Sequence, residues 1–200
     1  MKKALLFGLF AVLIISGCSQ GEAQQKEPPK ETALTIEPID LNENEKKLLK
    51  HTIMNQLEFF SLDGTLNEAD DLWFTIEIYE NGKKTGMSGG SSGEIDHYFN
   101  EERLSFGYST NSSNDSMTFT IGNDDGYFSS SAKVTVEGIS TFGKAIDEKV
   151  DLEKDEPVHL AYWAGTDKNE MRNSVKPFLD SNIDKAYVLT VTLKEDKDEK

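Results

Sequence analysis

Cysteine and basic charge are scarce in this chain of 200 residues, and each scarcity excludes a class of function. The single cysteine, Cys18, rules out an internal disulfide and a cysteine-based metal cluster. Lysine and arginine number 21 against 36 acidic residues, a formal net charge of -15 at pH 7. Because binding to nucleic acid needs a basic surface that neutralises phosphates, we expect no nucleic-acid partner. Hydrophobic residues make up 36% of the chain and aromatic residues 10%, which is enough for a folded core.

Long apolar runs are also scarce, and the one at the start of the chain is short for a membrane span. Lys2 and Lys3 precede an apolar run over residues 4–15, the pattern of a secretory signal. The run leads into Ile15-Ser16-Gly17-Cys18, which resembles the lipobox of bacterial lipoproteins of the Gram-positive type. The resemblance implies that the thiol of Cys18 carries diacylglycerol and that a signal peptidase cleaves between Gly17 and Cys18. The expected membrane partner is therefore reached through a lipid anchor.

Changes in composition divide the chain into four segments. Residues 1–17 are the expected signal peptide, and residues 18–33 are polar, lack aromatic residues and are expected to form a flexible tether. Residues 34–194 are expected to form a single β-rich extracytoplasmic domain, followed by a charged tail over residues 195–200. Without residues 1–17 the net charge is -17, so anionic membrane lipids repel the protein. The lipid attached to Cys18 is therefore expected to hold the protein at the outer face of the cell membrane.

Alternation of apolar and polar residues predicts a mainly β fold. In Leu72–Tyr79 the apolar side chains recur at every second position, and Asn81-Gly82 directly after this segment is typical of a β-hairpin. Further strands are predicted over residues 104–108, 117–121, 127–137, 158–163 and 187–193, with loops over residues 85–93 and 110–116. Many short strands separated by turn residues favour an antiparallel β-sandwich or open barrel with one or two short helices.

Two segments favour helices. A capping box at Asp40 to Glu43 and apolar residues at helical spacing predict a helix from about 43 to 55, although residues 57–62 fit a strand equally well. A second helix is predicted from about 166 to 179, with Asp167 at its start and Pro177 near its end. Residues 31–41 are expected to be extended, because Pro38 disfavours regular structure before it.

No arrangement of residues in the sequence is typical of an active site. The chain has three histidines, and it lacks the Gly-x-Ser-x-Gly elbow of hydrolases and the His-Glu-x-x-His motif of zinc enzymes. The acidic clusters at residues 67–71 and 123–126 lack the alternating spacing of a calcium loop. We therefore expect no catalytic residues, no metal and no cofactor.

Five residues form a candidate ligand platform. Trp73, Glu77 and Tyr79 fall on one face of their predicted strand, and His159 and Trp163 fall on one face of another. Sugar rings stack on exposed aromatic rings beside acids, so these faces would suit a glycan. The alternative is that the rings pack in the core of a two-layer fold.

Three hypotheses for function remain at this point. The first is a lipid-anchored extracytoplasmic binding or interaction protein without catalytic activity, whose partner is a cell-wall polymer, a glycan or another surface protein. The second is a hydrolase that acts on the cell wall or at the cell surface through paired carboxylates, for which the sequence nominates no pair. The third is an accessory or inhibitor subunit of a membrane complex.

Overall fold

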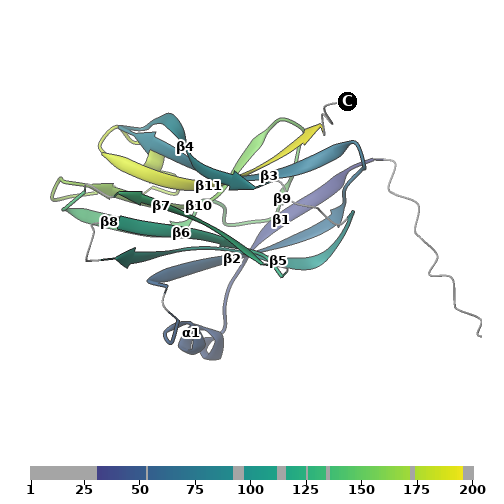
Figure 1. Cartoon of the computed structure of the whole chain (residues 1–200), viewed down its shortest axis with the longest axis horizontal. Coiled ribbons are helices and arrows are strands. Elements are labelled where there is room, and N and C mark those ends of the chain that lie inside the picture. Colours follow the sequence, from purple (N-terminus) through teal and green to yellow (C-terminus); the bar gives the residue numbers. More distant parts are fainter. Residues whose placement is uncertain are drawn as a thin grey trace, which may run out of the picture.

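The computed structural model describes residues 31–52, 54–91, 97–111, 116–124, 126–133, 136–171 and 174–195. Two antiparallel sheets lie one above the other, and a short helix lies outside both layers (Figure 1). The fold is mainly β and is a sandwich of two sheets rather than a closed barrel, as the alternation of the sequence predicts. The predicted lipidation at Cys18 and cleavage after Gly17 lie outside the described residues.

The first sheet has six strands in the order β7-β6-β5-β2-β1-β9. They are β1 (Ala33–Ile39), β2 (Gln56–Thr65), β5 (Tyr98–Asn111), β6 (Ser116–Gly122), β7 (Tyr127–Lys133) and β9 (Val150–Asp151). The segment that Pro38 was expected to leave without regular structure is β1, which pairs with β2 up to Ile39 and Phe59. Pro38 is tolerated near the end of this strand, where few ladder hydrogen bonds remain to be made.

The second sheet has five strands in the order β4-β3-β11-β10-β8. They are β3 (Asp70–Glu80), β4 (Lys83–Ser91), β8 (Ile139–Lys144), β10 (Pro157–Thr166) and β11 (Lys185–Glu195). Asn81 and Gly82 join β3 to β4 with φ angles of 51° and 77°, the left-handed pair that a type I′ hairpin requires, which confirms the predicted hairpin.

The glycine-rich segment that was predicted as a loop is mostly strand β4, so that prediction is wrong over residues 85–91. One of its glycines, Gly89, allows a close approach between the two sheets. A Cβ atom on Gly89 would lie only 2.6 Å from Cζ of Phe128, a residue of β7. Small residues are therefore needed where β4 passes β7, and the composition reflects this contact rather than a flexible loop.

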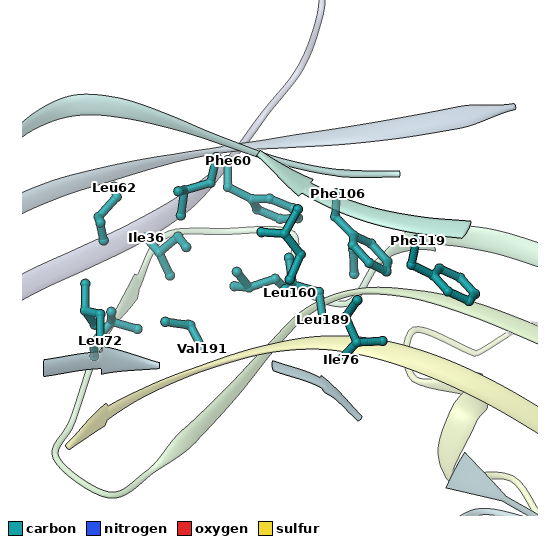
Figure 2. Packing of buried hydrophobic residues seen from close by; sticks show 14 of the residues in the cluster. Ile36, Phe60, Leu62, Leu72, Ile76, Phe106, Phe119, Leu160, Leu189 and Val191 are labelled. Carbon is teal, nitrogen blue, oxygen red and sulfur yellow. The ribbon is translucent and has the colours of Figure 1, made fainter. Parts of the chain in front are cut away.

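The hydrophobic core fills the space between the two sheets (Figure 2). Phe60 and Phe106 from the first sheet meet Ile76 and Leu189 from the second, and all four are fully buried. Burial of each such side chain contributes roughly 1.5–3 kcal/mol relative to leaving it in water. The alternating apolar positions of the strands thus hold the sheets together face to face.

The first predicted helix exists but is shorter than expected. α1 spans Glu43–Leu49, and its capping box is formed by Asn42 and Glu45, two positions later than predicted. After the helix the chain turns, and the hydroxyl of Thr52 donates a hydrogen bond to the carbonyl of Leu49 at 2.8 Å. None of the residues of α1 is buried, and the helix lies below β2 in the view of Figure 1.

The second predicted helix does not form in the described residues. Thr166 ends β10, and the described part of residues 166–179 contains a single helical element, the 3-10 turn η1 (Pro177–Leu179). The carboxylate of Asp184 accepts hydrogen bonds from the Thr166 hydroxyl at 2.9 Å and from the Asp167 backbone N–H at 2.7 Å, which fixes a turn where the helix was expected to start. Neither helical element among the described residues is long and apolar enough to cross a membrane.

Candidate functional site

A β-bulge in β10 places two of the predicted platform residues on opposite faces. The pairing of β10 with β11 shifts register between His159 and Ala161, so residues before and after the bulge no longer alternate in phase. Trp163 is only 2% exposed and packs between the sheets, with its ring centroid 6.0 Å from that of Tyr187. The expectation that Trp163 shares a face with His159 is therefore wrong, and its ring is part of the core.

The other predicted platform residues lie on the outer face of the second sheet, and three of them form one cluster. The hydroxyl of Tyr79 donates a hydrogen bond to Glu77 Oε2 at 3.0 Å and lies 3.1 Å from Nε2 of His159. Lys84 of β4 binds the second carboxylate oxygen of Glu77. Trp73 stands apart at 37% exposure, with the ammonium group of Lys194 4.9 Å from its ring centroid.

The Glu77 cluster is buried and its polar groups satisfy one another. Burial raises the pKa of Glu77, but its polar contacts with His159, Lys84 and Tyr79 outweigh burial and lower this pKa to about 2. Burial and the charge of Glu77 raise the pKa of Tyr79, which stays a neutral donor. Glu77 is 4% exposed, and the ring of Phe178 in η1 covers Tyr79 with centroids 5.3 Å apart. These contacts join three strands and η1, so this cluster stabilises the fold and forms no exposed stacking surface.

An open pocket of about 360 Å³ lies between α1 and the neighbouring ends of β2 and β8. It exists because β1 stops at its pairing with Phe59, which leaves the first residues of β2 without a partner strand on that side. The chain then leaves the sheet, forms α1 and returns. The apolar lining residues are Ile39, Leu41, Leu49, Met54, Leu57, Phe59 and Phe142, and the charged ones are Asp40, Lys46, Lys50, Glu58 and Lys144.

Glu58 is the unusual residue of this pocket, because it occupies a core-facing position. It shares a face of β2 with Phe60 and Leu62, both fully buried, and it pairs with the buried Phe106 of β5. Its half-buried carboxyl group has no hydrogen bond to a described residue. Burial raises the pKa of Glu58; the charge of Lys144 opposes this effect and the charge of Asp40 adds to it.

The other charged groups of the pocket differ in the number of hydrogen bonds and ion pairs that they make. The ammonium group of Lys144 donates hydrogen bonds to Asp40 Oδ1 at 2.7 Å and to the carbonyl of Ile39 at 2.9 Å. These contacts lower the pKa of Asp40, whose side chain is 98% exposed. The ammonium nitrogen of Lys46 lies 3.4 Å from Oε1 of Glu43, also on α1. Lys50 is exposed, and among the described residues it has no acidic partner.

A second recess, of about 530 Å³, lies near Asp70, and its chemistry differs from that of the α1 pocket. The carboxylate of Asp70 accepts hydrogen bonds from the Thr32 hydroxyl at 2.6 Å and from Lys154 at 2.8 Å. The Asp70 carboxylate therefore makes its hydrogen bonds within the fold. Among the residues that the structure describes, no three histidine, cysteine or acidic side chains converge as metal ligands would.

The fold and the pocket define a class of protein, an antiparallel β-sandwich with a charged, open pocket beside its helix. A family model described as the YgaN domain matches residues 35–193, a range that begins in β1 and ends in β11. The chain therefore belongs to the YgaN domain family. No curated protein and no solved structure matches it.

Proposed function

We propose that this protein is a lipid-anchored extracytoplasmic binding protein without catalytic activity, and that the pocket beside α1 is its ligand site. Glu58 is the observation that supports a binding site there. Partial removal of a carboxyl group from water, without a hydrogen-bond partner among the described residues, disfavours its charged form, and burial accordingly raises the pKa of Glu58. A perturbed acid in an open pocket is typical of functional positions.

The size and lining of the pocket favour a small ligand over a broad protein surface. A volume of about 360 Å³ falls within the range of small-molecule sites, roughly 300–1,000 Å³. Apolar side chains such as Leu57 and Phe142 supply contact area, while Glu58 and the lysines orient polar groups. A small molecule, or the end of a glycan or cell-wall polymer, suits such a site.

The anchor part of the proposal is tested at Cys18. We expect Cys18→Ala to abolish labelling by radioactive fatty acid and to leave unprocessed precursor, because no other thiol is present to accept the lipid. Ser19→Ala, one position further along, is the matched control and should be labelled like the wild type. Unchanged labelling of Cys18→Ala would refute the anchor.

The binding part is tested through a methyl group that lines the pocket. Met54 lies in the pocket, whereas Met87 is exposed on β4. The protein is labelled with ¹³C at its methionine methyl groups and mixed with a low-molecular-mass extract of the cells in which it naturally occurs. The extract should shift the methyl resonance of Met54 and leave that of Met87 unchanged. Gln56→Trp, which narrows the pocket, should reduce the shift; Lys133→Trp at the exposed end of β7 should not. Shifts confined to Met87, or no shift at all, would count against this site.

A second candidate function, hydrolysis by paired carboxylates, is favoured by one feature of the same pocket. Asp40 and Glu58 both line it, and their surroundings shift the two pKa values in opposite directions, as in enzymes that use one acid and one base. However, the carboxylate of Asp40 is bound to Lys144 and is open to solvent. For this reason binding is the better supported function.

Release of reducing ends from purified cell-wall polysaccharide separates the two candidates. A hydrolase would release them, and Glu58→Gln and Asp40→Asn would each slow release at least about 100-fold. Glu156→Gln, at an exposed position away from the pocket, is the control. Absence of release by the wild-type protein would remove hydrolysis of this substrate and leave binding.

A further inference from the structure

Charge in the α1 pocket is distributed against the trend of the whole protein. Three lysines line it, Lys46, Lys50 and Lys144, against the two acids Asp40 and Glu58, in a chain with a net charge of -15. Asp40 is already bound to Lys144. Lys46 is likewise paired, with its ammonium nitrogen 3.4 Å from Oε1 of Glu43. Lys50 is therefore the lining ammonium group that has no acidic partner among the described residues.

Apolar side chains occupy the rest of the lining and give the pocket two chemical parts. Leu49 comes from α1, Leu57 and Phe59 from β2, and Phe142 from β8. A ligand that fits both parts has an apolar body and one charged end. The sign of that end is set by Lys50: its ammonium group, which has no acidic partner among the described residues, attracts an anionic head group and repels a cationic one.

We propose that the α1 pocket binds a small monomeric amphiphile, an apolar chain that ends in an anionic group, with the head group beside Lys50 and Glu58 and the chain against Leu57 and Phe142. This inference rests on the proposed binding function of the same pocket. A carboxylate, a sulfonate or a phosphate ester would supply the same head-group chemistry.

Glu58 determines how such binding depends on pH. When protonated, its carboxyl group can donate a hydrogen bond to an oxygen of the anion; when ionised, it repels the anion. Lys144 from β8, Asp40 before α1, Lys46 and Lys50 on and after α1, and Tyr162 of β10 are the titratable groups around it. Because burial keeps the pKa of Glu58 above its ordinary value, the neutral form persists to a higher pH than that of an exposed glutamate.

The test uses three probes with the same eight-carbon chain: octanesulfonate, octyltrimethylammonium and octyl glucoside. Sulfonate and quaternary ammonium keep their charge at every pH used, so any pH dependence belongs to the protein. The full protein purified from membranes is held in zwitterionic nanodiscs, with empty nanodiscs to correct for partition. Binding is read from the methyl resonance of Met54, with Met87 as the internal reference.

At pH 5.5, octanesulfonate should bind at least about ten-fold more tightly than octyltrimethylammonium. Binding of octanesulfonate itself should be about ten-fold weaker at pH 8 than at pH 5. Glu58→Gln should bind it without this pH dependence. Lys50→Gln should weaken binding about three-fold, and Lys133→Gln, an exposed lysine on β7, should leave it unchanged.

Each other outcome overturns the inference. Stronger shifts of Met54 with octyltrimethylammonium or octyl glucoside would keep the pocket as a binding site and refute the anionic ligand. Binding to anionic lipid vesicles without binding to free octanesulfonate would refute a monomeric ligand. If none of the three probes shifts Met54, the amphiphile is refuted, and the proposed binding function is then decided by the cell extract alone.

Discussion

Glu77 and Glu58 each lie on an internal strand, Glu77 buried on the outer face of its sheet and Glu58 half-buried on the core-facing side of the other sheet. Their surroundings shift the pKa values of the two carboxyl groups in opposite directions. Glu77 accepts hydrogen bonds from Tyr79 and Lys84, with Nε2 of His159 3.6 Å from its Oε2, and its pKa falls to about 2. Glu58 has no such partner among the described residues, and its pKa is raised. The number of partners, rather than burial alone, thus decides whether a buried carboxyl supports the fold or is left available.

The helical elements next to the two glutamates also differ, in how far they are buried. Phe178 of η1 is fully buried and closes over the Glu77 cluster, with its ring centroid 5.2 Å from that of His159. α1 has no buried residue and leaves an open pocket beside Glu58. η1 therefore covers the Glu77 cluster on the outer face of the second sheet. α1, in contrast, borders an open pocket that a ligand can enter.

The largest expected difference between the two glutamates is in the stability of the fold. Glu77→Ala should lower the free energy of unfolding by roughly 3 kcal/mol, because it leaves the hydroxyl of Tyr79 and the ammonium group of Lys84 without their acceptor. Glu58→Ala should lower it by less than about 1 kcal/mol. Urea denaturation of the two variants at pH 7 measures both values. Equal losses would show that the two carboxyl groups have the same structural role.

Glu77 should also contribute a distinct part of the loss of stability in acid. Because its pKa in the folded protein lies below its ordinary value of 4.5, its stabilising effect is complete above pH 4.5 and is lost as the pH falls toward 2. The loss amounts to roughly 3 kcal/mol for a difference of this size. Glu77→Gln should lack this part of the acid transition in urea melts between pH 5 and 2, while Glu58→Gln should retain it. Identical acid transitions in Glu77→Gln and the wild type would contradict the lowered pKa.

Local patterns in the sequence predict the strands and the hairpin because both depend on neighbouring residues. Leu72–Tyr79 alternates as β3 does, and Asn81-Gly82 adopts the φ angles that its composition favours. Where a contact distant in sequence decides the structure, local patterns mislead. Gly89 of β4 is required by Phe128 in the other sheet, and turn hydrogen bonds to Asp184 replace the start of the second predicted helix.

The candidate site could be predicted only in part, because its geometry depends on two features that the sequence does not display. The bulge at β10 separates Trp163 from His159, and no residue type marks its position. The pocket depends on where β1 ends, which pairing with β2 determines. One signal was present: once residues 57–62 are taken as a strand, Glu58 falls on the same face as Phe60 and Leu62, an acid at a core-facing position.

The smallest expected effect concerns Glu58 above neutral pH. Because its pKa in the folded protein lies above the ordinary value of 4.5, the folded state holds its proton more tightly than the unfolded state, so its contribution to stability declines as the pH rises from 4.5 through the raised pKa. Glu58→Gln cannot ionise, and it should gain at most about 1 kcal/mol over the wild type at pH 8 and little at pH 4.5. Urea melts at the two pH values measure this gain, with Glu156→Gln as the exposed control that should show none. A loss of stability at pH 8 would mean that the Glu58 carboxylate has a partner within the fold, and the contrast with Glu77 would fail.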